Sequence, residues 1–221
     1  MVTFKDIDPF FVIDLANPEN PEILGELKIP GWSDYLHPYD ENHIIGIGKS
    51  TVENEWGGIS PGGVKLSLFN VEDVANPTEV DTFEIGGRGS DSEVLRDHKA
   101  LLFDKDRELL VLPVRETTSS YSNVWQGAYV LGVTEAGFEE RDKIAHYTGE
   151  RENYWSWWGS SSAVKRAVYM DDVLYTVSLE KVRMHDLNTL ESINTVELPY
   201  SEPDYGYPRP MPEPMPDDVM R

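Results

Sequence analysis

The sequence contains no cysteine, and this absence removes several kinds of chemistry at once. Without thiols the chain forms no disulfide, no iron–sulfur cluster and no thiolate nucleophile. No apolar run approaches the ~20 residues of a membrane-spanning helix. The N-terminus also lacks the basic region and apolar core of a signal peptide. We therefore expect no membrane insertion, while the lack of cysteine assigns no compartment.

Basic residues are scarce. The 221 residues include 19 Lys and Arg against 40 Asp and Glu, which gives a formal net charge of −21. Nucleic-acid binding needs clustered cations against the phosphates, and anionic lipid attracts the same side chains. We therefore expect no nucleic-acid partner and no docking on anionic membranes. An acidic surface favours solubility and also suits cation binding.

The sequence also lacks a long amphipathic helical pattern, and short strand–turn–strand units stand in its place. In the stretch 12–29, Asp14 and Asn17-Pro18 favour a turn, because Asx side chains bond nearby backbone N–H groups and proline fixes φ. Hydrophobic and polar residues alternate after this turn, which indicates a strand with one wetter face. The unit recurs in four copies, at 12–29, 68–85, 129–144 and 182–198.

The spacing of these copies predicts the architecture. Asn17 and Asn76 lie 59 positions apart, and Asp14 and Asp186 lie 172 apart. The second interval is three steps of about 57, a period typical of four-stranded sheets arranged around an axis. We therefore predict an all-β fold, a β-propeller of four-stranded antiparallel blades, with about three and a half blades present.

We divide the predicted strands into units that begin with the repeated hairpin. A stray strand at 1–4 comes first, and half a unit, at 181–186 and 192–198, comes last. The three complete units have strands near 10–14, 22–28, 34–37 and 43–48, then 64–71, 79–85, 100–103 and 109–114, then 128–134, 138–146, 163–170 and 173–178.

These units set the domain boundaries. Residues 1–198 form the propeller domain, or the C-terminal portion of one. Residues 199–221 contain seven prolines and several acidic residues. Because proline cannot donate to a sheet ladder, we expect this tail to be extended and disordered. A lone strand at the start leaves an edge uncovered, which predicts self-association or further N-terminal blades.

Several segments resemble a known family of archaeal and bacterial proteins, the secreted or surface proteins with a C-terminal β-propeller domain. The segments are 2–4, 8–15, 36–43, 59–69, 97–100, 102–105, 164–167 and 173–177. The resemblance covers residues 1–198 and implies that the chain is the C-terminal part of a longer extracellular or cell-surface protein. Without a signal peptide the chain would stay in the cytoplasm if produced as it stands. The resemblance implies no reaction.

The turn Asp104, Asp106, Glu108 is a candidate Ca²⁺ site, because it places oxygen ligands at alternate positions. It lacks the central glycine and distal glutamate of a calcium loop. Asp40 and Asp171 occupy the same place in their own units, which favours ordinary hairpin turns as the alternative.

Aromatic residues crowd the segment 151–158. Trp155, Trp157 and Trp158, next to Arg151, form a candidate platform for a sugar ring or a partner protein. The alternative is that these tryptophans pack between blades.

The histidines supply two further candidates. His37 and His43 flank one hairpin and suit a metal pair, although no third ligand has a matching spacing. Asp97 and His98 are either an acid–base pair or part of a structural network between blades.

These observations predict a non-catalytic binding scaffold of a secreted or cell-surface protein, with protein or carbohydrate partners held by blade loops. We assign no catalytic residue. One alternative is a cation-dependent enzyme with its site in the propeller channel, which requires carboxylates or histidines to converge there. The other is a truncated propeller fragment without independent function.

Overall fold

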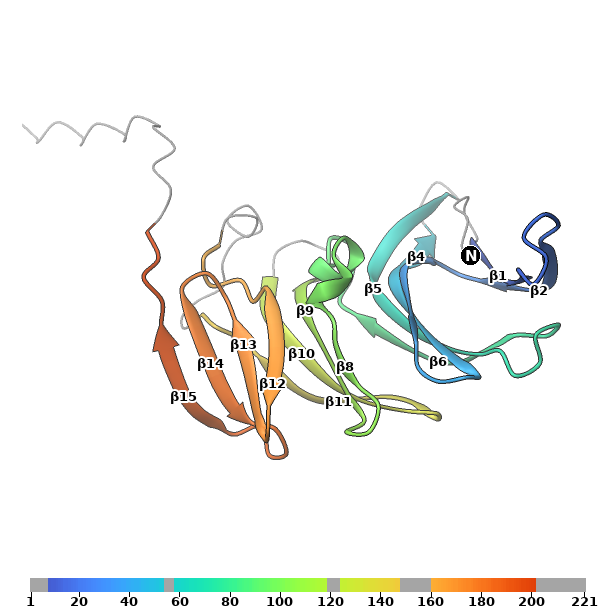
Figure 1. Ribbon diagram of the computed structural model, residues 1–221. Coiled ribbons are helices and arrows are strands. Elements are labelled where there is room, and N and C mark those ends of the chain that lie inside the picture. The colour runs from blue at the N-terminus through green and yellow to red at the C-terminus, as the bar shows by residue number, and fades with distance from the viewer. Residues whose placement is uncertain (1–7, 54–57, 119–123, 148–159, 202–221) are drawn as a thin grey trace, which may run out of the picture.

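The computed structural model describes residues 8–53, 58–118, 124–147 and 160–201. These residues form four antiparallel sheets that stand side by side in chain order, and Figure 1 shows them as an open row. The first and fourth sheets lie at opposite ends of that row.

The sheets differ in size, and the second and fourth are four-stranded meanders. The first pairs β1 (Asp8–Asp14) with β2 (Glu22–Ile29). The second runs β3 (Trp32–Pro38), β4 (His43–Glu53), β5 (Ile59–Asn70) and β6 (Thr78–Ile85). The third contains β7 (Asp91–Ser92), β8 (Leu102–Asp104), β9 (Leu109–Thr117), β10 (Val124–Thr134) and β11 (Gly137–Ile144). The fourth contains β12 (Arg166–Met170), β13 (Val173–Val177), β14 (Lys181–Asp186) and β15 (Ser192–Glu197).

Two 3₁₀ turns, η1 (Glu93–Leu95) and η2 (His98–Ala100), follow β7. Within the described ranges, no helix has the length and apolar character needed to cross a membrane.

The predicted hairpins are present, but their predicted grouping is wrong by two strands. Each repeated hairpin supplies the last two strands of a sheet, and the two-stranded sheet comes first rather than last. The boundary lies at Pro30 and Gly31, where proline has no N–H to donate and Gly31 adopts a φ of +93°. A repeat reveals its period but not its starting point, so the sequence did not locate this boundary. The predicted strand at 1–4 lies outside the described residues.

Asx turns close the repeated hairpins, as the sequence indicates. The Asp14 carboxylate accepts a hydrogen bond of 2.8 Å from the N–H of Ala16. Asp73 accepts one of 3.1 Å from Ala75, and Asp186 accepts one of 2.9 Å from Asn188. The same side chain therefore fixes the same turn in three of the copies.

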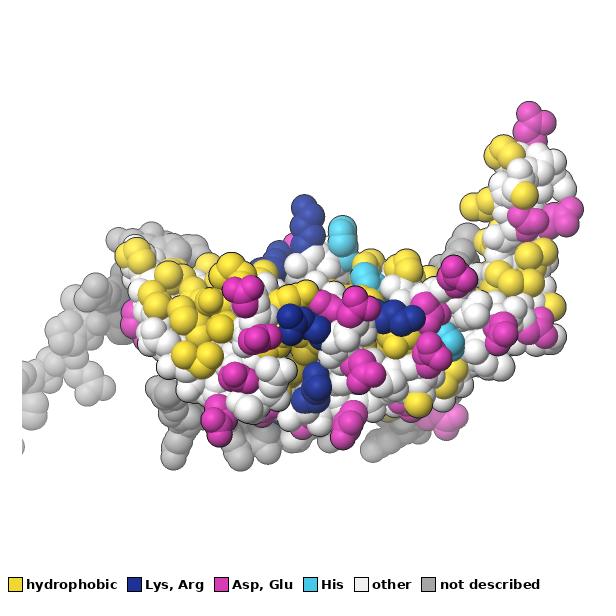
Figure 2. Space-filling view, turned by 60° about the horizontal axis from the view of Figure 1, so that its bottom comes forward, with side chains coloured by type: hydrophobic (Ala, Val, Ile, Leu, Met, Phe, Trp, Pro, Cys, Tyr) yellow, Lys and Arg dark blue, Asp and Glu magenta, His cyan; other side chains and the backbone are white. Residues whose placement is uncertain are grey.

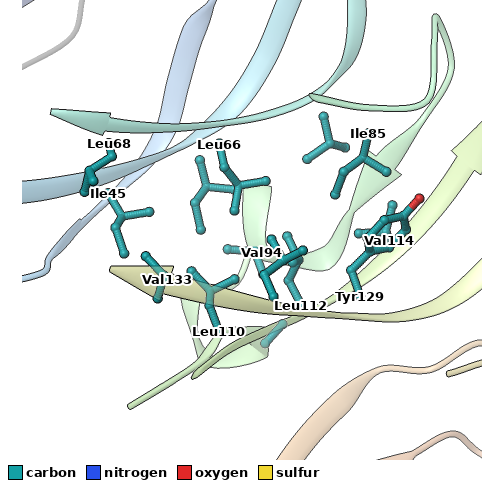
Figure 3. Close-up of a cluster of buried hydrophobic side chains, with 14 of the residues drawn as sticks. Ile45, Leu66, Leu68, Ile85, Val94, Leu110, Leu112, Val114, Tyr129 and Val133 are labelled. Carbon is teal, nitrogen blue, oxygen red and sulfur yellow. The ribbon is translucent and has the colours of Figure 1, made fainter. Parts of the chain in front are cut away.

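The largest hydrophobic cluster lies between the second and third sheets. Figure 3 shows Ile45, Leu66 and Leu68 of one sheet pointing toward Leu110 and Leu112 of the next. All five side chains are fully buried. Burial of a large aliphatic side chain contributes about 1.5–3 kcal/mol, so this contact is a major source of stability.

Both faces of the inner strands of the two middle sheets are buried. On β9, Leu110 and Leu112 face the second sheet, while Leu109 and Val111 pack with residues of the fourth. A third cluster, built around Phe10 and Phe69, joins the first sheet to the second. Burial on both faces explains why the stretch 109–114 is continuously apolar rather than alternating.

We expect Leu112→Ala to lower the free energy of unfolding by about 2–5 kcal/mol, because it leaves a cavity between two sheets. Val80→Ala on β6, where the valine is 42% exposed, is the matched control and should change it by under ~1 kcal/mol. Denaturant unfolding followed by tryptophan fluorescence measures both. Equal effects would show that packing between the sheets is not a main source of stability.

Candidate functional site

The first strand of the third sheet is interrupted. β7 pairs with one end of β9 through Asp91 and Arg115, and β8 pairs with the other end through Leu102 and Val111. Residues 93–101 between them, which we call the insert, contain η1 and η2. Side chains cap both turns: Ser92 accepts from the N–H of Val94 at 3.3 Å, and the residue before η2 caps it in the same way.

The insert contacts the sheets on both sides. The His98 ring stacks on Tyr35 of β3 with centroids 5.6 Å apart. On the other side, Lys165 donates to the Glu93 carboxylate at 2.6 Å, and Arg166 of β12 forms an ion pair with Asp97. The insert therefore links the second, third and fourth sheets.

A group of charged residues, which we call the polar cluster, lies where the insert meets the second sheet. Its members are Asp34, Lys49, Asp91, Arg96 and Arg115. Arg96 donates a hydrogen bond of 3.1 Å to one carboxylate oxygen of Asp91, and its other terminal nitrogen lies 3.0 Å from the second oxygen in an ion pair. Lys49 donates to the carbonyl of residue 90, and Arg115 donates to the carbonyl of residue 89 at 2.6 Å.

Burial shifts two pKa values in the polar cluster toward each other. Desolvation lowers the pKa of Lys49, although Asp91 and Asp34 oppose the shift. Desolvation on its protein-facing side raises the pKa of Asp34, opposed by a hydrogen bond from Trp32. Such opposed shifts are found at catalytic sites and also in structural ion-pair networks.

The bonds of the polar cluster indicate a structural role. Two of its three cations bond backbone carbonyls, and the third bonds Asp91. In the described part of the chain, no three acidic or histidine side chains are arranged to hold a metal ion. Asp34 and Asp91 are the two carboxylates of the polar cluster. The cation-dependent enzyme stays a prediction.

A pocket of about 300 Å³ opens where β9 ends and β10 begins, and we call it the rim pocket. Its main lining side chains are Glu116, Trp125, Lys143 and Tyr147. The pocket lies on the third sheet, just before the chain enters residues 148–159. Its volume is at the lower end of the range for small-molecule sites.

Aromatic rings and one ion pair form the wall of the rim pocket. Trp125 packs edge-to-face on Tyr129, with ring centroids 5.3 Å apart. The Lys143 ammonium lies 4.4 Å from the Tyr129 ring centroid and 3.2 Å from the Glu116 carboxylate. Tyr129 donates a hydrogen bond of 2.6 Å to the same carboxylate. Burial, together with Glu116, raises the pKa of Tyr129, so its hydroxyl stays a donor.

The rim pocket offers three kinds of contact to a ligand. Trp125 provides an apolar ring, and Glu116 and Lys143 provide an acceptor and a donor. The Glu116 and Lys143 side chains are 30% and 32% exposed, so both reach solvent. Aromatic faces beside hydrogen-bonding groups suit ligands with one apolar and one polar face.

The structure places the candidate Ca²⁺ residues on a hairpin turn. Asp104 accepts hydrogen bonds from the Tyr169 hydroxyl and from the N–H of Arg107, and these bonds lower its pKa. Glu108 closes the turn with a φ of 50°, and Asp106 is exposed. This geometry agrees with the hairpin-turn interpretation, and Ca²⁺ binding stays a prediction.

Equivalent turns bond one another from sheet to sheet, which the sequence reasoning missed. Lys105 donates to Asp40 at 2.8 Å, and Arg107 donates to Asp172 at 3.3 Å. Each of these pairs spans 65 positions, as does the bond between Asp104 and Tyr169. Residues of opposite charge recur at this interval in the turns of the sequence. That recurrence could have predicted bonds between neighbouring turns.

Arg151, Trp155, Trp157 and Trp158, the candidate ligand platform, lie outside the described residues. In the sequence they follow Tyr147, which lines the rim pocket. The platform stays a prediction.

The histidine candidates each have a partner of their own. His43 bonds the Asp40 carboxylate at 2.9 Å, and His37 lies 2.9 Å from the Tyr35 hydroxyl. Burial would raise the pKa of Asp40, but hydrogen bonds from Lys105, the N–H of residue 42 and His43 hold it well below its usual range.

Two other histidines are buried between the third and fourth sheets. His146 follows β11, and its Nε2 lies 2.8 Å from the Thr176 hydroxyl. Burial lowers the pKa of His146 to about 4, and the nearby charge of Arg183 acts in the same direction. Burial also lowers the pKa of His185 on β14. Both histidines are therefore neutral at pH 7.

Comparison with known proteins agrees with the four-sheet arrangement. A family model described as a Beta propeller domain matches residues 1–190. An uncharacterised protein of Archaeoglobus fulgidus is 35% identical over 198 residues, which cover 90% of this chain and 26% of that protein. An uncharacterised protein of Methanocaldococcus jannaschii is 36% identical over 207 residues, which cover 94% of this chain and 28% of that protein. The chain spans about a quarter of the length of these curated relatives.

The family match and the antiparallel sheets confirm the predicted fold class. The match also confirms the propeller part of the resemblance. The secreted or surface location and the C-terminal placement stay predictions.

We expect Asp91→Asn to lower the free energy of unfolding by about 1–3 kcal/mol, because it leaves Arg96 and Lys49 without their carboxylate. Asp172→Asn removes the partner of Arg107 at a side chain that is 71% exposed. This control should cost under ~0.5 kcal/mol. Thermal and denaturant unfolding measure both, and equal losses would contradict a structural role for the polar cluster.

We expect His146 to make the fold sensitive to acid. Its pKa is about 4 in the folded chain and ~6.5 in an unfolded chain, so the unfolded chain binds the proton first as pH falls. Stability present above pH ~6.5 is therefore lost as pH approaches 4, by about 3 kcal/mol. Urea unfolding across this pH range checks the loss. His146→Gln, which keeps a polar group near Thr176, should lose less stability over this pH range. If the free energy of unfolding of this variant falls with pH as steeply as that of the unmodified chain, His146 is not the cause.

Proposed function

This chain belongs to the β-propeller domain family, and from that premise we propose that it is a non-catalytic binding scaffold of a secreted or cell-surface protein. We propose further that its rim pocket holds one sugar ring of a carbohydrate ligand. The observation that carries the proposal is the grouping of Trp125, Tyr147, Glu116 and Lys143 around one solvent-open pocket.

The contacts in the rim pocket fit a sugar. The C–H face of a pyranose packs on an aromatic ring, and its hydroxyl groups both donate and accept hydrogen bonds. Trp125 supplies such a ring, the Glu116 carboxylate accepts, and the Lys143 ammonium donates. Because these two charges offset each other, a neutral sugar fits better than a charged one.

The position of the pocket supports the proposal. Tyr147 is its last described lining residue, and Arg151, Trp155, Trp157 and Trp158 follow within the next eleven positions. Loops on a rigid sheet scaffold commonly carry binding function.

The remainder of the fold supports a scaffold role. Charged pairs such as Lys105–Asp40, Lys165–Glu93 and Arg166–Asp97 join neighbouring sheets. These bonds connect the second and fourth sheets to the third sheet, which carries the rim pocket. A rigid support of this kind lowers the entropic cost of binding.

We expect Trp125→Ala to weaken carbohydrate binding tenfold or more, a loss of about 1.4 kcal/mol. Lys143→Met should also weaken it, because it removes a donor and leaves Glu116 unbalanced. Calorimetric titration with neutral glucose, mannose, galactose and N-acetylglucosamine oligomers measures the effect.

Trp32→Ala is the matched control, since Trp32 lies on β3 outside the rim pocket. The control should bind like the unmodified chain. The proposal fails if none of the oligomers binds, or if Trp125→Ala binds as tightly as the control.

A further inference from the structure

The Glu116 carboxylate of the rim pocket is held through only one of its two oxygens. The Tyr129 hydroxyl donates to Oε2 at 2.6 Å, and the Lys143 ammonium donates to the same oxygen at 3.2 Å. Within the described part of the chain, no donor bonds the other oxygen, Oε1. A carboxylate oxygen accepts more than one hydrogen bond, so Oε2 serves both donors and Oε1 is left for a ligand.

Strand pairing brings these groups together. Glu116 of β9 lies opposite Trp125 of β10, and Lys143 of β11 lies opposite Tyr129 of β10. Directly opposed residues share a face, and so do residues an even number of positions apart on one strand. All four side chains therefore lie on one face of the third sheet, where the backbone ladder fixes their spacing.

Tyr129 is placed to fix the direction of the Glu116 carboxylate. Its ring is 2% exposed and packs in the large cluster between the second and third sheets. A ring packed in this way has no room to turn aside, so its hydroxyl keeps pointing at Oε2. Tyr129 does not line the rim pocket itself. It acts on a ligand through Glu116 and is therefore a positioning residue.

Lys143 supplies a donor beside this acceptor. Its ammonium carries three protons, and Oε2 of Glu116 takes one of them. The carboxylate of Glu140 lies farther away, at 3.9 Å, and the Lys143 side chain is 32% exposed. The ammonium therefore keeps a proton for a ligand, and the pocket presents an acceptor and a donor side by side.

Glu116 differs from a typical surface carboxylate of this protein. The chain has 40 Asp and Glu, and Figure 2 shows acidic side chains spread over one face of the molecule. Glu116 is only 30% exposed, and two donors fix its orientation. An acceptor that is already fixed loses little side-chain freedom on binding, so it favours a ligand whose donor matches it.

We propose that the rim pocket selects a vicinal diol, and that Tyr129 sets this selectivity by holding Glu116 with Oε1 toward the ligand. One hydroxyl of the diol donates to Oε1, and its neighbour accepts from the Lys143 ammonium. Adjacent hydroxyl groups on a sugar ring offer this donor and this acceptor together. The inference rests on the proposed carbohydrate function and adds which group of the sugar is recognised.

The two hydroxyls of the diol have different roles, and fluorine distinguishes them. Fluorine cannot donate, so in place of the first hydroxyl it leaves Oε1 without a donor and brings a partial negative charge to the carboxylate. In place of the second hydroxyl it still accepts weakly from the ammonium. Sites built to bond a hydroxyl strongly reject ligands that lack it. The two replacements should therefore weaken binding by different amounts.

NMR titration of the full chain, followed at the indole N–H signal of Trp125, tests the proposal. The probes are the methyl glycosides of glucose, mannose and galactose, each compared with analogues in which one ring hydroxyl is replaced by fluorine. We expect fluorine at one position to weaken binding by a factor of ~10 or more. Fluorine at the neighbouring position should weaken it less.

Two variants test the positioning role. Tyr129→Phe removes only the hydroxyl, so the carboxylate gains freedom to turn, and the two fluorinated analogues should bind within ~threefold of each other. In Glu116→Gln, Tyr129 and Lys143 still need an acceptor, so they hold the amide oxygen and turn the amide NH₂ toward the ligand. The ligand group at that place must then accept, and fluorine at the first position should no longer weaken binding.

Tyr169→Phe is the matched control, because the Tyr169 hydroxyl also donates to a carboxylate, that of Asp104, outside the rim pocket. It should discriminate between the analogues as the unmodified chain does. If no glycoside or oligomer binds, the proposed function fails and this inference fails with it. If the sugars bind but fluorine has the same effect at every position, the proposed function stands and the diol inference is overturned. Unchanged discrimination in Tyr129→Phe would overturn the positioning role of Tyr129.

Discussion

The contact between one apolar sheet face and the next is the interaction on which this structure depends. A strand sends alternate side chains to opposite faces, so β9 delivers Leu110 to one neighbour and Leu109 to the other. A sheet with two apolar faces is stable only when both are covered. The middle sheets meet this condition, and their position between neighbours follows from it. The hydrophobic effect thus favours stacking of the described sheets in a row.

Polar groups add direction to this non-directional attraction. Turns at equivalent positions bond each other from sheet to sheet, as in the Lys105–Asp40 and Arg107–Asp172 pairs. The exposed Arg107–Asp172 pair contributes little free energy, while Lys105–Asp40 is partly buried. Both pairs favour one register between neighbouring sheets. The insert does the same through His98 and Asp97, which bond sheets on opposite sides. Buried groups such as His146 instead make the packing dependent on their protonation state.

Sequence reasoning recovered the parts of the fold that depend on local chemistry. The Asp14 and Asp73 turns, the strands beside them and the repeat all follow from side-chain chemistry and period. The boundary between sheets did not follow, because Pro30 and Gly31 read as one turn among many. The rim pocket was also missed, because Glu116, Trp125 and Lys143 come from three different strands and meet only after folding. The insert was missed because two three-residue turns have no detectable periodicity.

The break between β7 and β8 has a consequence for how the third sheet assembles. Both strands pair with β9, so their ladder joins two segments of chain separated by the insert. Until β9 is made, neither strand has its partner, and the residues before it have only local turns to form. On a ribosome β7 and β8 therefore pair only once β9 has been made, and β10, β11 and the fourth sheet follow it. The second sheet thus gains its cover before the fourth sheet has been synthesised.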